Sequence, residues 1–268
     1  MNRAALRSVI KGVLRSTVAL LGSGQRRSEG PRVLCYHGVT EQPSDEWSVT
    51  PAQLHEQMTI VQGEGNPVTL PQLISWLLDG GSLPERAIAV TFDDGYLDVL
   101  ERAAPILDQR RIPATAFVIS GLVDGQSKDV SYQPSRPLLT WQQISSLAAS
   151  GWTIGAHTLS HPVLAQQTRA ESLRQLLESR RRIGEVLGQS ITLLAYPYGT
   201  RQTVSPREWA LAEEAGYRAA FLDAIGAVQR GQDRFALPRC KVLASDSLRV
   251  FRASLSGGLD RWRHVEDR

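Results

Sequence analysis

Short apolar segments alternate with amphipathic segments along most of this chain, and this alternation limits the fold more than any other feature of the sequence. The apolar segments have the length of buried strands, and the amphipathic segments have the spacing of helices. Such an alternation predicts an α/β fold with a mainly parallel sheet, and seven strands suit one barrel. The seven expected strands are residues 33–37, 88–92, 114–119, 152–156, 191–196, 217–222 and 235–239.

Capping boxes mark where the helices between these strands should begin. In a capping box, a Ser or Thr side chain and a Glu or Gln three residues later satisfy free backbone amides reciprocally. Four places have this pattern: Thr50 with Gln53, Thr140 with Gln143, Thr168 with Glu171, and Ser205 with Glu208. The longest irregular stretch, residues 121–139, has a length that indicates a functional surface loop.

Basic residues are concentrated at the N-terminus. Residues 1–27 contain six basic residues and no acidic one, whereas the rest of the chain has 24 basic and 27 acidic side chains. A basic excess in one terminal segment does not make a stripe across the fold, so we expect no nucleic-acid partner. We expect a basic amphipathic leader at residues 1–30, followed by a single domain at residues 31–268.

The leader has apolar residues at helical spacing, while Arg3, Arg7, Lys11 and Arg15 recur at every fourth position. This pattern is typical of a helix that contacts a membrane surface through residues 1–27. A degenerate export signal, a plain capping helix and a disordered leader remain as alternatives. The sequence leaves the location open and favours a membrane-peripheral or cytoplasmic protein over an exported one.

The motif TFDDG at residues 91–95 follows an apolar segment and places two carboxylates side by side. Adjacent carboxylates at a strand end repel each other and lose solvent together, so a cation or a metal must compensate them. A simpler interpretation is that Asp94 or Asp98 caps the helix expected to begin near Leu97.

A second motif, HTLSH at residues 157–161, follows the next apolar segment but one. Two histidines four residues apart, on a helical turn or in a compact loop, can bind one metal ion, although both could also be structural. One aspartate and two histidines would leave a divalent metal with open positions for water and a substrate oxygen. Active sites of α/β barrels gather at the carboxyl ends of strands. The residues that end or follow such strands are His37, Asp93, Asp94, His157, Tyr198 and Arg239.

TFDDG, HTLSH and the later YPYG at residues 196–199 resemble, in matching order, the motifs of the polysaccharide deacetylase family, which is carbohydrate esterase family 4 with NodB homology. The resemblance covers roughly residues 32–245. It implies a distorted (β/α) barrel that removes N-acetyl groups from N-acetylhexosamine units of a poly- or oligosaccharide. It also implies one divalent metal ion as the cofactor, with zinc as the expected ion, and an N-acetylated glycan as the substrate partner.

The resemblance assigns roles to individual residues. Asp93 corresponds to the catalytic base, and Asp94, His157 and His161 correspond to the metal ligands. Tyr198 corresponds to the residue whose backbone amide stabilises the oxyanion.

The chain departs from the common family pattern in two places. Residues 194–196 lack the arginine that often begins the third motif, and no Leu-x-His segment after Arg239 supplies a general acid. One branch, resembling the deacetylases of poly-N-acetylglucosamine, has its catalytic histidine in an N-terminal Tyr-His strand, and Tyr36 and His37 match it. By the same logic Arg239 is the candidate partner of Asp93, although a strand-end arginine can equally be a structural ion-pair partner.

Aromatic side chains near the expected rim are candidates for stacking on sugar rings, and these are Trp47, Tyr132 and Trp141. Cys35 and Cys240 are expected to be buried thiols, with a bridge between neighbouring strands as the alternative.

Two other functions compete with the deacetylase interpretation. A non-haem iron enzyme also uses two histidines and a carboxylate, although the adjacent second aspartate and the strand–helix pattern disfavour it. A non-catalytic carbohydrate-binding relative would be expected to have lost Asp93 or a metal ligand, and this sequence retains them.

Overall fold

The computed structural model describes residues 29–125, 132, 134 and 136–260, together with Arg15 and Thr17. The strands pair in parallel, in the order β7-β6-β5-β4-β3-β1-β8, and β2 pairs with the amino end of β3. The strands are β1 Arg32–Tyr36, β2 Asn66–Pro67, β3 Ala87–Phe92, β4 Ala114–Val118, β5 Thr153–Ala156, β6 Leu193–Ala195, β7 Ala219–Phe221 and β8 Cys240–Lys241.

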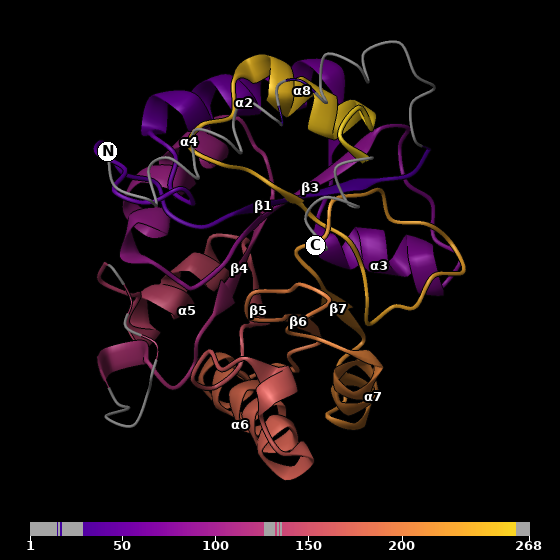
Figure 1. Ribbon diagram of the computed structural model, residues 1–268. Helices are drawn as coiled ribbons and strands as arrows, with labels where there is room; N and C mark the ends of the chain where they lie inside the picture. The colour runs from indigo at the N-terminus through magenta and orange to yellow at the C-terminus, as the bar shows by residue number, and fades with distance from the viewer. Residues whose placement is uncertain are drawn as a thin grey trace.

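Helices surround the strands on the outside of the sheet (Figure 1). They are α2 Pro51–Glu64, α3 Leu70–Leu78, α4 Ala104–Gln109, α5 Trp141–Ala149, α6 Arg169–Leu187, α7 Pro206–Glu214 and α8 Leu248–Ser256. A π-helical turn, Val99–Ala103, leads directly into α4, and short 3₁₀ turns occupy Val123–Gly125 and Leu164–Gln166. Parallel strands joined by outer helices confirm the expected α/β class.

The barrel closes only in part, at the point where the chain runs from β7 to β8. Leu237 forms a single parallel bridge with Phe221, and its amide donates to the Ala220 carbonyl at 3.0 Å. The expected distorted (β/α) barrel is therefore confirmed. The expected strand at residues 235–239 is wrong, because Pro238 has no amide hydrogen and the regular pairing with β1 begins only at Cys240.

Strand alternation sorts the side chains of β1 and β3 onto two faces. Leu34 and Val90 belong to the larger hydrophobic cluster, whereas Val33 and Ala89 belong to the smaller one. Residues two positions further along the second face are Cys35, on β1, and Thr91, on β3. Polar and reactive side chains therefore replace apolar ones as this face approaches the carboxyl ends of the strands.

Most of the expected helix starts have the predicted caps. Capping boxes are present at Thr50, Thr140 and Ser205. At Thr168 only half of the box forms, because the hydroxyl accepts from the Glu171 amide while the Glu171 carboxylate binds the Arg174 guanidinium at 2.6 and 2.7 Å.

Most of the predicted leader lies outside the described residues, so its helix and its contact with a membrane stay predictions. Among the few leader residues that the structure describes is Arg15, whose buried guanidinium pairs with Asp246 at 2.9 Å and donates to the Lys241 carbonyl at 3.1 Å. This side chain therefore contacts the barrel beside β8. Within the described part of the chain, no helix has the length and apolar character needed to cross a membrane. Residues 126–131, 133 and 135 of the predicted surface loop are also outside the description.

Candidate active site

A cavity of about 600 Å³ opens at the carboxyl ends of β1, β3 and β5. Six of the seven residues that the sequence singled out line this cavity: His37, Asp93, Asp94, His157, His161 and Tyr198. The seventh, Arg239, lies behind Asp93 and contacts it directly.

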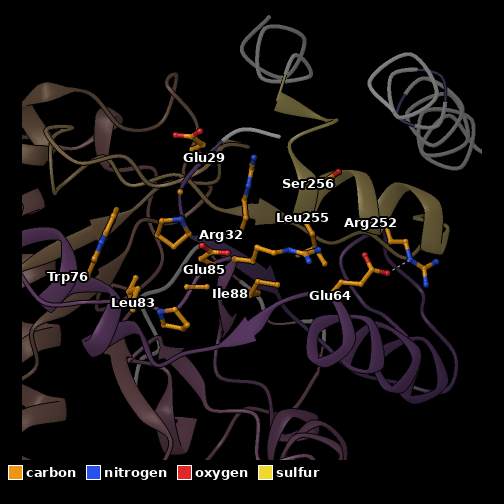
Figure 2. Close-up of a pocket in the computed structure, with 15 residues that line it drawn as sticks. Glu29, Arg32, Glu64, Trp76, Leu83, Glu85, Ile88, Arg252, Leu255 and Ser256 are labelled. Atoms are coloured by element: carbon orange, nitrogen blue, oxygen red, sulfur yellow. Dashed lines mark hydrogen bonds and ion pairs between the residues drawn. The ribbon is translucent and has the colours of Figure 1, made fainter. Parts of the chain in front are cut away.

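A second cavity, of about 440 Å³, lies at the opposite ends of β1 and β3 (Figure 2). Two of its three arginines pair with carboxylates: Arg252 with Glu64 at 2.6 Å, and Arg32 with Asp260 at 2.6 Å. Neither histidine nor cysteine is among its lining residues. The groups suited to hydrolytic chemistry are therefore at the carboxyl end of the barrel.

Asp94, His157 and His161 converge on one point in the first cavity. Asp94 Oδ1 is 3.5 Å from Nε2 of both histidines, and one ligand atom from each residue lies within 4.8 Å of the others. Oxygen and nitrogen ligands of a tetrahedral zinc, each at about 2.0–2.1 Å from the ion, are roughly 3.3–3.4 Å apart. Asp94 Oδ1 is also buried and accepts no hydrogen bond from the described residues. These donors fit a divalent metal ion.

The two histidines are presented by a compact loop and not by a helical turn. Thr158 and His161 have positive φ values of 65° and 59°, a conformation that non-glycine residues rarely adopt. The loop is held by the Thr158 hydroxyl, which accepts from the His161 amide at 3.0 Å, and by Gln175, which accepts from the Leu159 amide at 3.1 Å. His157 Nδ1 lies 2.8 Å from the Ala195 carbonyl, so its Nε2 is left to face Asp94.

Asp94 does not cap a helix. The turn after it has Asp98 at its start, and Asp98 makes no capping hydrogen bond. Asp94 itself has φ 71° and accepts from the Tyr132 hydroxyl at 3.1 Å through Oδ2. The simpler interpretation of the acidic pair as a helix cap is therefore wrong.

Electrostatics keep Asp94 ionised and His161 neutral. Burial raises the pKa of Asp94, but contact with His157 and the nearby rings of His37 and His161 outweigh burial and hold that pKa well below its ordinary value. Burial, assisted by His157, lowers the pKa of His161 to about 3. An ionised carboxylate and a neutral imidazole are the protonation states that a metal ligand requires.

Arg239 donates two hydrogen bonds to Asp93, one from each terminal nitrogen of its guanidinium, and these two donors form a planar fork. The two hydrogen bonds measure 2.7 Å to Oδ1 and 2.6 Å to Oδ2, and both side chains are fully buried. The Arg239 Nε–H donates to the Leu222 carbonyl at 3.1 Å, which fixes the plane of the fork. Burial raises the pKa of Asp93, but Arg239 and then His157 outweigh it and keep that pKa below its ordinary value. Asp93 is therefore an ionised carboxylate held in one orientation.

His37 directly follows β1 and lies close to Asp93. Its ring is 5.7 Å from the ring of Trp47, and its Nδ1 is buried without a hydrogen-bond partner among the described residues. Asp223, two residues after the end of β7, also lines the cavity and pairs with Lys241 at 2.6 Å. Burial raises the pKa of Asp223, but Lys241, Arg239 and His37 together lower it to about 2.

Sequence reasoning missed Asp223 and Lys241. Asp223 follows an expected strand, as the other site residues do, and this placement was the signal that could have identified it. Lys241 gave no such signal, because it lies in β8, which the sequence placed too early.

Tyr198 lies at the mouth of the cavity with 46% of its side chain exposed. Its backbone has φ 62°, and its ring is 4.8 Å from the ring of His161. Tyr132 also packs against His161, with ring centroids 4.1 Å apart. Trp47 and Tyr132 line the cavity as sugar-stacking candidates should, whereas Trp141 packs against the main hydrophobic cluster and is not one of the lining residues.

The two cysteines are free thiols, and both are buried. The alternative of a bridge between neighbouring strands is therefore wrong. Cys35 lies against the site, with Sγ 3.6 Å from Asp93 Oδ2. Burial raises the pKa of the Cys35 thiol well above its ordinary value.

Known proteins share both the sequence pattern and the fold. Residues 80–220 match the family model described as polysaccharide deacetylase. A Bacillus subtilis (strain 168) protein, YxkH, whose name carries the same family term, is 26% identical over 211 residues, which are 78% of this chain and 70% of that protein. The Staphylococcus aureus (strain MSSA476) protein named poly-beta-1,6-N-acetyl-D-glucosamine N-deacetylase is 23% identical over 210 residues, 75% of this chain and 69% of that protein. The solved structure of IcaB from Ammonifex degensii superposes with a TM-score of 0.73 at 26% identity, covering 86% of this chain and 99% of that one.

Proposed function

This chain belongs to the polysaccharide deacetylase family, and from that premise we propose that it is a metal-dependent hydrolase that removes N-acetyl groups from N-acetylhexosamine units of a poly- or oligosaccharide. One observation carries the proposal: an ionised, oriented carboxylate, Asp93, adjoins a cluster of three metal-binding side chains in one cavity. The relative named as a poly-beta-1,6-N-acetyl-D-glucosamine deacetylase supports an exopolysaccharide or cell-envelope glycan as the substrate class.

Asp94, His157 and His161 would hold the metal, with zinc as the proposed ion because nitrogen and oxygen ligands in a tetrahedral arrangement suit it. When bound, such an ion polarises the acetyl carbonyl and makes water a stronger nucleophile at neutral pH.

Asp93 is the proposed general base. Its carboxylate is ionised at neutral pH. Oδ2 accepts from both Arg239 and the Cys35 thiol, whereas Oδ1 accepts from Arg239 and keeps a second lone pair for a proton from the attacking water. The Tyr198 amide is the proposed donor to the oxyanion, and one such donor is commonly worth about 2.7–4 kcal/mol in the transition state.

His37 is the proposed general acid, which protonates the sugar nitrogen as the acetyl group leaves. Such an acid must be cationic when it acts. His37 lines the same cavity as Asp93 and the proposed metal ligands, as this role requires.

Mass spectrometry of a panel of N-acetylglucosamine oligomers tests the proposal. We expect the metal-loaded enzyme to lower the oligomer mass by about 42 Da for each acetyl group that is replaced by hydrogen, and the Asp93→Asn variant to remove far fewer acetyl groups. Oxygen consumption coupled to substrate change would instead favour the iron enzyme. Binding of the oligomers without any acetyl loss would favour a carbohydrate-binding relative.

A further inference from the structure

We propose that Cys35, His37 and Asp93 form a second metal site, which takes a thiophilic divalent ion such as cadmium or excess zinc and thereby inhibits the enzyme. The site is distinct from the Asp94, His157 and His161 cluster. Its inhibitory effect rests on the proposed function, whereas the binding of the ion does not.

The geometry of the three side chains suits an ion. One ligand atom from each residue lies within 4.8 Å of the other two. Cys35 Sγ is 3.6 Å from Asp93 Oδ2. Sulfur at about 2.3 Å and oxygen at about 2.0 Å from a tetrahedral zinc are roughly 3.5 Å apart, so these two atoms already have the separation that a shared ion requires.

The fold holds the three donors together. Cys35 and His37 are two residues apart at the end of β1, so their side chains leave the chain on the same side. The Asp93 amide donates to the Tyr36 carbonyl at 2.9 Å, which places Asp93 beside both of them. The His37 Nδ1 is buried and has no hydrogen-bond partner among the described residues, so the imidazole loses no hydrogen bond there when it reorients toward an ion.

The ion would take the place of one proton. In the free enzyme the Cys35 thiol points its hydrogen at Asp93 Oδ2. On binding, a sulfur–metal bond forms, the sulfur–hydrogen bond breaks, and the proton leaves to solvent. Asp93 keeps both hydrogen bonds to Arg239, because each carboxylate oxygen has a second lone pair.

Ligand chemistry sets the selectivity of this site. Thiolate ligands favour zinc, cadmium and similar soft ions over magnesium, calcium or manganese. An ion reaches the site through the active-site cavity, since His37 and Asp93 line it and Cys35 lies directly behind them. An ion bound there would use Asp93, the proposed base, and His37, the proposed acid, as ligands. Neither side chain could then transfer a proton, so occupation of the site should inhibit the enzyme.

Cadmium titration of the metal-loaded protein provides the test, because only a cysteine ligand produces thiolate-to-cadmium charge-transfer absorption in the ultraviolet. The proposed catalytic metal site, Asp94, His157 and His161, contains no sulfur, so exchange of its metal for cadmium produces no such absorption. We expect the wild-type protein to show the absorption at about one equivalent and Cys35→Ala to lose it. Cys240→Ala is the matched control, since Cys240 is also free and buried but contacts the Gly226 and Ser254 carbonyls at 3.7 and 3.8 Å.

Inhibition is measured as the ratio of activity with and without added cadmium in the same variant, which cancels any change in basal rate. Loss of the thiolate should raise the inhibitory cadmium concentration at least ~10-fold in Cys35→Ala and leave it unchanged in Cys240→Ala. Cys35→Ser serves as a second variant in case the alanine protein does not fold.

Two outcomes overturn the inference: no charge-transfer absorption in the wild type, or absorption that disappears with Cys240 and persists without Cys35. If the Cys35-dependent absorption is present but no N-acetyl sugar is hydrolysed, the metal site stands and the proposed function fails. If hydrolysis is present and the absorption is absent, the reverse holds.

Discussion

Removal of the Arg239 guanidinium should shift the pH at which the enzyme becomes active. Arg239 donates two hydrogen bonds, of 2.7 and 2.6 Å, to a carboxylate that has no other cation in such close contact among the described residues. Arg239→Met retains a long apolar side chain and leaves Asp93 buried without its partner. Burial then acts on Asp93 without its main opposing charge, so the pKa of this carboxyl should rise.

The direction of the shift follows from the proposed role of Asp93 as general base. A general base must be ionised, so kcat/KM should fall at low pH as Asp93 takes up a proton. In the wild-type enzyme the pKa of Asp93 lies below its ordinary value. The fall of kcat/KM on the acid side of the pH profile, here called the acid limb, should therefore begin only at low pH. An arginine in contact changes a neighbouring carboxyl pKa by about 1–3 units, and the limb of Arg239→Met should move upward by at least that amount.

Stability should fall as well. Removal of one partner of a buried ion pair commonly destabilises a protein by about 3–5 kcal/mol, and both side chains here are buried. Because the pKa of Asp93 is depressed in the folded protein, the pair stabilises the fold above the unfolded-state pKa of about 3.9, and this contribution disappears as pH falls through the folded-state value. Urea unfolding at pH 7 measures the difference between wild type and Arg239→Met, and a pH series below about 3.9 follows the loss of that difference.

The pH dependence of kcat/KM on an N-acetylglucosamine oligomer tests whether Arg239 lowers the pKa of Asp93 in the active enzyme. Arg239→Lys restores one positive charge without the fork, so it should bring the acid limb part of the way back. If Arg239→Met loses activity equally at every pH, with the limb in its wild-type place, Arg239 is only a structural partner and the reasoning about Asp93 is refuted.

Three further substitutions should separate the other roles. Asp93→Asn should retain the metal and lose kcat by about 10²–10⁴-fold, as metal analysis and steady-state kinetics of one preparation will measure; full activity would remove the base from the mechanism. His157→Ala should lose metal and activity together, and a variant that keeps both would show that the ligand assignment is wrong. His37→Ala should lose most N-deacetylation but hydrolyse an activated aryl acetate nearly as well as wild type, because a phenolate leaves without a proton; equal losses on both substrates would make His37 a binding residue.

The strands of the fold could be predicted closely wherever an apolar segment ends in a polar motif. The expected segment at residues 88–92 and the observed β3 end at the same residue, Phe92, because Asp93 and Asp94 cannot remain in the apolar core without partners. The final strand could not be placed in the same way. Residues 235–239 have the apolar character of a buried strand, but Pro238 has no amide hydrogen to donate to a neighbouring strand. The strand that pairs with β1 is only two residues long, Cys240–Lys241.

Local sequence located the histidine loop but not its conformation. The four-residue spacing of His157 and His161 is equally compatible with a helical turn, and the structure forms a loop because Thr158 and His161 both adopt positive φ. The contacts that stabilise this loop come from Gln175, on α6, and from Ser179, whose hydroxyl donates to the Thr158 carbonyl at 3.0 Å. Partners so far along the chain leave no signal in the spacing of the motif itself.

Because β8 pairs with β1, residues from the first and the last strand regions of the barrel meet in the proposed active site. His37 follows β1, and Arg239 immediately precedes β8, so the pairing of Leu34 with Cys240 brings the two ends together across the sheet. Asp93, directly after the neighbouring β3, then contacts the arginine before β8 and lies close to the histidine after β1. The third motif can lack its arginine because the fork that orients Asp93 comes instead from this later segment. The same arrangement brings Cys35 against Asp93, and this contact is the basis of the second metal site proposed above.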